Sequence, residues 1–385
     1  MSEECMQAYR KLDESQQRLI RFWLPALMNG LLAWLLLLIL GETPLVRASG
    51  LALVIVGVTL ALRRMGAVLA MVGALTLALS PAFWSQTGGG QGEPATIVIA
   101  LGLAAVATIA VVFFSKRPSI GFGIGIIVFA AFFWSQIGTP RSIRLTAFVI
   151  AWLMYLLIDM LLITNPRPDD APLILRDGGL KTVNGAVPAR MYHIFGILLL
   201  VTVGIVNDPL LTLLMPAIVL SLILTKTRLE WWYWLAIGIV IGVGIRGLWI
   251  DYLQAQSPFI MLADWRLGAN WLEMIDLIIQ QFTVFGAGLS LLGLARLARW
   301  YAPLGTVSMV GFAAYWLFGV VYSSANEAIL LLPMFVIFVL WMTYAVLAIS
   351  EWGAKSLPDH PIAGRYLIIS VYALLPAWLL WHIVV

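Results

Sequence analysis

Runs of apolar residues long enough to cross a lipid bilayer recur along this chain, and they constrain its fold more than any other feature. A helix satisfies its own backbone hydrogen bonds, so a run of about 20 apolar residues is typical of a membrane-spanning helix. The sequence therefore predicts an all-α fold, a polytopic integral membrane bundle of about 13 transmembrane helices. The runs lie at residues 22–41, 48–62, 67–84, 95–114, 119–137, 145–163, 191–206, 209–225, 231–249, 277–295, 303–322, 327–349 and 366–385.

The composition excludes the soluble classes of protein. Only 11% of the 385 residues are charged and 62% are hydrophobic, whereas a soluble domain carries about 25% charged residues. A cytosolic enzyme, a secreted domain and a nucleic-acid binder are excluded on this ground. The single cysteine, Cys5, permits no intrachain disulfide, and the three histidines are too far apart in the sequence to suggest a metal cluster.

The distribution of basic residues predicts the orientation in the cell membrane. With the N-terminus placed inside, 18 basic residues fall on the inner side and 4 on the outer side, as the positive-inside rule requires. We therefore expect a multi-pass protein with its N-terminus inside and its C-terminus outside. The inner set is Arg10, Lys11, Arg18, Arg21, Arg63, Arg64, Lys116, Arg117, Arg167, Arg176, Lys181, Arg190, Lys226, Arg228, Arg296, Arg299, Lys355 and Arg365, and the outer set is Arg47, Arg141, Arg144 and Arg266.

The chain divides into four predicted segments. Residues 1–21 form a cytoplasmic leader, either an amphipathic helix on the membrane surface or a solvated tail. Residues 22–163 hold six spans, and residues 191–385 hold seven. The Pro- and Gly-rich stretch 164–190 is the longest predicted cytoplasmic loop and joins the two groups of spans.

Acidic residues gather on the predicted outer face, where a buried carboxylate is costly and often functional. They are Glu42, Glu93, Asp208, Asp251, Asp264, Glu273, Asp276 and Glu327. Asp159, by contrast, lies near the inner end of its span, where we expect a helix-packing partner rather than a proton relay.

Two outer segments carry the main functional hypotheses. Glu93 follows the Gly-rich stretch TGGGQGEP, where a ligand can approach the backbone; the alternative is a carboxylate that caps the next helix. In residues 246–276, Arg246 and Arg266 are candidates for binding a lipid phosphate, because guanidinium groups suit phosphate. The alternative there is an Arg–Asp pair that holds an interfacial or re-entrant element down, with Trp249, Tyr252, Trp265 and Trp271 at headgroup level.

Three stretches of the sequence resemble the GT-C class of multipass glycosyltransferases. The run from Gly41 to Arg47, continuing to Arg63-Arg64, resembles the G-x-x-x-x-x-R … R-R span of the protein O-mannosyltransferase-like and lipid A aminoarabinose-transferase-like families. The segment LSPAFWSQ resembles the end of their l-s-P-x-f-W-x-q span, and Glu93 takes the acidic position that follows. Residues 246–294, with Asn270-Trp271, and the late Tyr322, Asn326-Glu327 and Leu332-Pro333 resemble the second half of such a family.

The resemblance implies an enzyme that transfers sugar from a polyprenyl-phosphate carrier on the extracytoplasmic face. Glu93 first, and Glu42 second, would then be the catalytic carboxylate, either as general base or as ligand to a divalent cation. No further cofactor is implied. The sequence departs from the class in one respect: no aspartate precedes Gly41 on the outer side, because Phe22 to Leu40 is a continuous apolar segment.

Two other functions stay open at this stage. The missing aspartate and the short loops favour a non-catalytic integral subunit of a larger membrane complex, with other membrane subunits as its partners. A lipid or small-solute transporter is the third alternative, although no internal repeat supports it. In every case the expected partners include membrane lipids and exclude nucleic acid.

Overall fold

A computed structural model describes residues 19–87, 143–164, 186–225, 229–255, 259–324 and 327–384. These residues form helices and turns without any strand beyond the isolated bridge between Ile260 and Tyr322. The all-α prediction is therefore confirmed for the described chain. Predicted spans 95–114 and 119–137, with most of the leader and of the 164–190 loop, lie outside it.

The first group of helices follows the apolar runs closely. After a π-helical turn at Leu19–Trp23 come α3 (Leu24–Ile39), α4 (Leu45–Leu62), α5 (Ala67–Ala78), α6 (Pro81–Trp84) and α9 (Ile143–Thr164). Gly66 has a φ of 104° in the turn between α4 and α5, a conformation that favours glycine. This turn lets α5 run back alongside α4.

The second group begins at α11 (Ala186–Asn207), inside the stretch predicted as a loop. The helices that follow are α12 (Met215–Leu224), α13 (Trp231–Leu248), α14 (Gly268–Trp300), α15 (Ala302–Val321), α16 (Glu327–Leu330), α17 (Leu332–Ser356) and α18 (Pro361–Val384). A 3-10 turn at Pro209–Leu214 precedes α12, a π-helical turn at Trp249–Gln254 follows α13, and a 3-10 turn at Leu262–Arg266 precedes α14.

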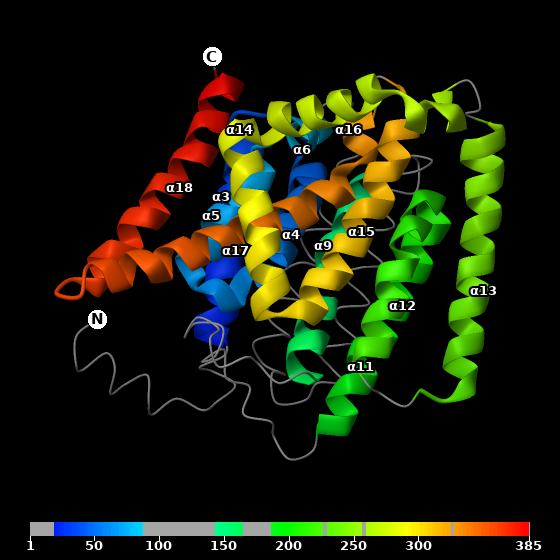
Figure 1. Ribbon diagram of the computed structural model, residues 1–385, viewed down its shortest axis with the longest axis horizontal. Helices are drawn as coiled ribbons and strands as arrows, with labels where there is room; N and C mark the ends of the chain where they lie inside the picture. The colour runs from blue at the N-terminus through cyan, green and yellow to red at the C-terminus, as the bar shows by residue number, and fades with distance from the viewer. Residues whose placement is uncertain are drawn as a thin grey trace.

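Helix α17 forms the centre of the molecule (Figure 1). It packs against α5, α9, α14, α15 and α18, so it joins the two predicted groups of spans around one core. Its large side chains Trp341 and Tyr344 are almost fully buried. A helix that is apolar all round belongs in such a core, whereas α13 stands at the edge of the bundle (Figure 1).

The described residues contain eight helices that are long and apolar enough to cross a membrane, or nine if one bent pair counts as a single span. Two shorter apolar helices lie at His193–Asn207 and Pro209–Leu224. This is the pattern of a multi-pass membrane protein. The total of about 13 spans stays a prediction.

Two helices are broken near the end of the bundle that is uppermost in Figure 1, which we call the upper end. The run predicted as one span at 67–84 bends by 64° between α5 and α6, at Ser80-Pro81. Helix α14 bends at Thr283, whose φ of 64° and ψ of 169° are non-helical. The buried Gln281 joins the two breaks, because its Oε1 accepts a hydrogen bond of 2.7 Å from the Ala82 backbone N–H.

The break in α14 corrects the predicted boundaries. The apolar pattern places this span at 277–295, but the helix begins nine residues earlier, at Gly268. The part before Thr283 lies across the upper end of the bundle and the part after it descends through the bundle (Figure 1). Glu273 and Asp276 interrupt the apolar pattern because their side chains are exposed, whereas Asn270 donates to the Val320 carbonyl of α15.

Candidate functional site

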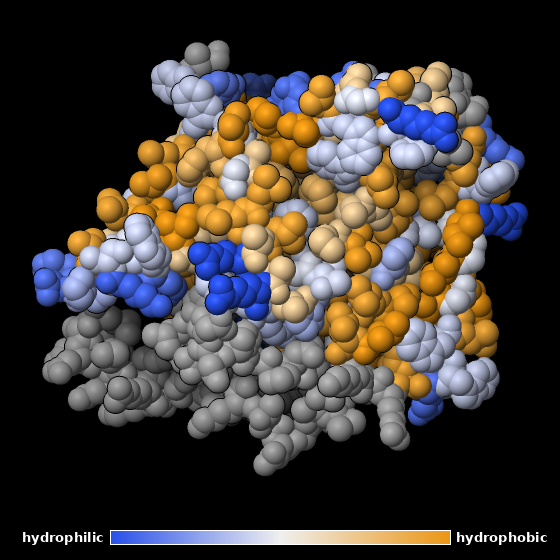
Figure 2. Space-filling view, in the orientation of Figure 1, coloured by the Kyte–Doolittle hydropathy of each residue, from blue (hydrophilic) through white to orange (hydrophobic). Residues whose placement is uncertain are grey.

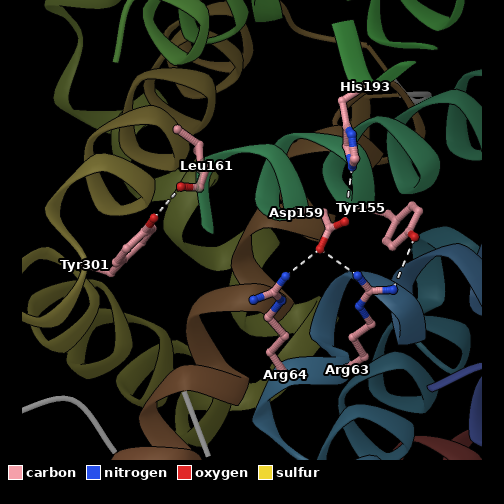
Figure 3. A network of polar contacts seen from close by, with 7 residues as sticks. All are labelled: Arg63, Arg64, Tyr155, Asp159, Leu161, His193 and Tyr301. Carbon is pink, nitrogen blue, oxygen red and sulfur yellow. Dashed lines mark hydrogen bonds and ion pairs between the residues drawn. The ribbon is translucent and has the colours of Figure 1, made fainter. Parts of the chain in front are cut away.

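The largest group of buried charges lies at the opposite, lower end. Arg63 and Arg64 occupy the turn between α4 and α5, and Asp159 lies on α9 near its end. His193 comes from α11. We call these four residues the lower ion network (Figure 3).

One carboxylate is the centre of the lower ion network. Asp159 Oδ1 accepts hydrogen bonds from Arg63 Nη2 at 2.6 Å and from Arg64 Nη2 at 2.7 Å. Asp159 Oδ2 lies 3.1 Å from His193 Nε2. Arg63 also donates to the Tyr155 hydroxyl at 3.2 Å and lies over the rings of Phe22 and Tyr155.

The lower ion network holds helices together. It ties α4, α9 and α11 to one another, and the Tyr301 hydroxyl adds a hydrogen bond to the Leu161 carbonyl nearby (Figure 3). Both oxygens of Asp159 contact side chains from neighbouring segments, as expected for a helix-packing partner. The prediction that Asp159 is a packing partner is confirmed.

The upper end carries a second cluster of cations, Arg47 and Arg144, which we call the upper arginine pair. Both side chains donate to the 3-10 turn at Ser85–Thr87, which follows α6: Arg47 Nη1 to the Thr87 carbonyl and Arg144 Nε to the Gln86 carbonyl, each at 3.2 Å. The two guanidinium groups are near enough for their charges to repel. Within the described chain Arg144 has no carboxylate partner.

Glu42 lies beside the upper arginine pair. A Cβ atom on Gly41 would be 3.2 Å from Thr87 Cγ2, so the turn that carries Glu42 packs against the residue to which Arg47 donates. Glu42 is exposed and has a φ of 45°, a left-handed conformation that is uncommon for glutamate. Local strain of this kind is frequent at functional sites.

A second carboxyl group at the upper end lies in an unusual environment. Glu327, the first residue of α16, is half-buried. Burial, with a smaller contribution from the charge of Glu273, raises its pKa from about 4.5 to about 7. Because α16 packs against α6, Glu327 lies at the same end of the bundle as the upper arginine pair, whose side chains donate to the turn after α6.

The remaining predicted site residues are dispersed. Arg246 is exposed in the last turn of α13, and Arg266 is exposed and lies over the Trp265 ring at 5.4 Å. The described residues show no ion pair for either arginine, and the alternative of an Arg–Asp pair stays a prediction. Asp208 is buried and caps the 3-10 turn at Pro209–Leu214, accepting from Leu210 N–H and the Tyr252 hydroxyl.

Asp251 is partly exposed in the turn after α13. Asp264 lies in the turn before α14, where its side chain is not described, and Glu93 lies outside the described residues. Among those residues that the structure does describe, no group of three or more His, Cys, Asp or Glu side chains could hold a metal ion.

The sequence analysis counted Arg47 and Arg144 as outer loop charges, and Arg47 also as the arginine of the GT-C-like motif, but it did not pair them. Their positions in the chain are almost a hundred residues apart, so no local pattern pairs them. A usable signal does exist: each arginine lies within the first turn or so of a long apolar helix. A signal in the sequence also exists for the lower ion network. It is the adjacent pair Arg63-Arg64 together with Asp159, a lone carboxylate on an apolar span.

Comparisons with known proteins give no relative. No protein-family profile, no curated protein and no solved structure matches the chain.

Proposed function

We propose that the chain is a membrane glycosyltransferase of the GT-C type, which takes a sugar from a polyprenyl-phosphate carrier at the upper end. The upper end would then face the extracytoplasmic side. The observation that carries this proposal is the upper arginine pair. The sequence resemblance to GT-C enzymes, whose first motif includes Arg47, also supports it.

The upper arginine pair has the chemistry of a phosphate site. Two neighbouring guanidinium groups that are partly removed from water repel each other, and an anion between them relieves the repulsion. Arginine presents planar N–H donors that match phosphate oxygens. Helix α4 begins at Leu45, only two residues before Arg47, and its N-terminal dipole adds to the positive potential.

Transfer also needs a base for the acceptor hydroxyl. In the proposed reaction the acceptor oxygen forms a bond to the anomeric carbon of the sugar, while the bond from that carbon to the carrier phosphate breaks. The electron pair leaves with the phosphate, which the upper arginine pair would stabilise, and the hydroxyl proton passes to a carboxylate. Glu42 and Glu327 are the described candidates, with Glu93 as the candidate from the sequence.

Lipid binding tests the proposal before any acceptor is known. The chain in nanodiscs is titrated with undecaprenyl phosphate and, in parallel, with undecaprenol, which lacks the phosphate. We expect the phosphate form to bind more tightly and Arg144→Gln to weaken it by roughly 10- to 100-fold, the value of one hydrogen bond to a charged group. The matched control is Arg296→Gln, an exposed arginine at the lower end. Equal binding of the two lipids, or no effect of Arg144→Gln, would overturn the proposal.

The base is then assigned by transfer assays with a radiolabelled lipid-linked sugar. Glu93→Gln, Glu42→Gln and Glu327→Gln are compared, and the variant of the true base abolishes transfer while it leaves lipid binding intact. A base acts when it is ionised, so Glu327 would make transfer rise with pH through about 7. Retained transfer in a variant removes that residue from the site.

One observation favours the alternative of a non-catalytic subunit. Gly238 and Gly242 lie one turn apart on α13, and open space surrounds both. Small residues at this spacing allow close packing of a second membrane helix. Stoichiometric partners in a native purification, together with no phosphate-dependent lipid binding, would support this alternative.

A further inference from the structure

The upper end has a rim that is exposed on the outside of the bundle. It consists of the last turn of α13, the turns Trp249–Gln254 and Leu262–Arg266, and the part of α14 before Thr283. We call these segments the upper rim. None of the proposed transferase residues belongs to it, so the inference below is independent of the proposed function.

Arg246 points away from the bundle. Cβ atoms on Gly244 and Gly247 would collide with Thr212 and Pro209, which identifies the packed face of α13. At about 100° per residue, Arg246 lies on the opposite side of the helix, and it is exposed. It has no hydrogen bond or ion pair to any described residue.

The first part of α14 has three distinct faces. Met274, Ile278 and Phe282 are buried against the protein. A neighbouring apolar flank, made by Leu272, Ile275 and Ile279, includes side chains that are 67% (Leu272) and 47% (Ile275) exposed. The third face is polar and is made by Glu273, Asp276 and Gln280, with Gln280 donating to Asp276 at 2.7 Å.

These three faces match a helix at the boundary of a membrane. One face packs on the bundle, the apolar flank suits lipid chains, and the polar face suits water. The exposed rings of Trp249 and Trp265 are the side chains that favour headgroup depth. Figure 2 shows the apolar side of the bundle in orange, with hydrophilic atoms concentrated toward its ends.

The basic and acidic residues of the upper rim occupy different places: Arg246 comes before the end of α13, whereas Glu273 and Asp276 lie on the face of α14 turned away from its buried residues. Arg246 lies in the last turn of an apolar span, where an arginine facing lipid reaches the phosphate level. Arg266 lies over the exposed ring of Trp265, a residue type that favours headgroup depth. The carboxylates Glu273 and Asp276 lie on the water-facing side of α14 instead, and Asp251 follows the end of α13.

We infer that the upper rim binds phospholipids whose headgroup carries both a phosphate and a terminal primary ammonium. The phosphate contacts Arg246 and Arg266, and the ammonium lies farther out, next to the carboxylates. An anionic headgroup without the ammonium satisfies the arginines but is repelled by the acids. This placement of the charges therefore selects the aminophospholipid.

Native mass spectrometry tests this inference with phosphatidylethanolamine and phosphatidylglycerol as probes, added at equal concentration to the delipidated chain. We expect phosphatidylethanolamine to be retained preferentially. The double variant Arg246→Gln/Arg266→Gln lowers its retention by about fivefold, the size expected for two exposed charge contacts. The control Arg296→Gln/Arg299→Gln, at the lower end, retains the lipid as the unmodified chain does.

A second pair of variants separates the two parts of the headgroup. Asp251→Asn/Asp276→Asn keeps the phosphate contacts and should bring retention of the two lipids close to equal. Equal retention by the unmodified chain, or an unchanged result for Arg246→Gln/Arg266→Gln, would overturn the inference. Undecaprenyl phosphate binding should stay unchanged in the rim variants, so this test and that of the upper arginine pair fail separately.

Discussion

At the scale of single residues, the lower ion network depends on one carboxylate. Asp159 is 7% exposed and faces two arginines as well as His193. A buried ion pair adds little net stability over an apolar pair of the same shape, but the loss of one partner leaves the other charge buried without compensation. Asp159 is therefore the residue whose replacement should affect the fold most.

We predict that Asp159→Asn destabilises the chain by about 3–5 kcal/mol, because Arg63 and Arg64 lose their shared negative charge. Thermal unfolding in mild detergent measures this change. The matched control is Asp359→Asn, in the exposed turn between α17 and α18, which should leave the unfolding temperature unchanged. A neutral result for Asp159→Asn would mean that other groups compensate the two arginines.

At the scale of elements, the apolar pattern predicted where helices run but not where they break. The run 67–84 is apolar almost throughout, yet it bends at Ser80-Pro81. Proline has no backbone N–H and therefore cannot continue the hydrogen bonding of the preceding helix. The sequence does not indicate the kink of α14, because Thr283 is neither proline nor glycine. Its backbone nevertheless has a positive φ of 64°. The kink lies two residues after Gln281, whose side chain accepts a hydrogen bond from Ala82, 199 residues away in the chain.

The kink leads to a prediction about stability. The φ and ψ of Thr283 lie in a region that is essentially restricted to glycine and costs other residues about 1–3 kcal/mol. Thr283→Gly should therefore stabilise the chain by an amount in that range, less the entropy that glycine loses on folding. Detergent unfolding measures it.

The same substitution in a regular helix gives the control. Thr306 is an exposed residue of α15, where glycine should destabilise by about 0.3–0.5 kcal/mol, the difference between the helix propensities of threonine and glycine. If Thr283→Gly destabilised the chain as Thr306→Gly does, the kink would not carry strain.

At the scale of the whole molecule, the sequence was sufficient for the class of fold and insufficient for the site. Hydropathy alone predicts a multi-pass helical protein, because lipid imposes the same rule on every span. The pairing of Arg47 with Arg144, and of Asp159 with Arg63, depends on how distant helices pack, and a single sequence does not encode this in any local pattern. Glu42 was identified from its charge, whereas its backbone conformation is visible only in the fold.

The arrangement of charges in the folded chain leads to the last prediction, the orientation of the bundle. Arg63, Arg64 and Arg365 lie toward the lower end, and the carboxylates Glu42 and Glu327 lie toward the upper end. By the positive-inside rule the lower end faces the cytoplasm. We therefore predict that the upper arginine pair and the upper rim face the outside, where a GT-C-type enzyme would act.

Cysteine labelling in intact cells measures this orientation. With Cys5→Ser as background, Asp276→Cys at the upper end should react with a membrane-impermeant maleimide, because its side chain is exposed. Asp359→Cys, exposed at the lower end, should react only after the cells are permeabilised. The reverse result would put the lower ion network on the outside. It would also remove the upper arginine pair from any extracytoplasmic reaction, even though its geometry would be unchanged.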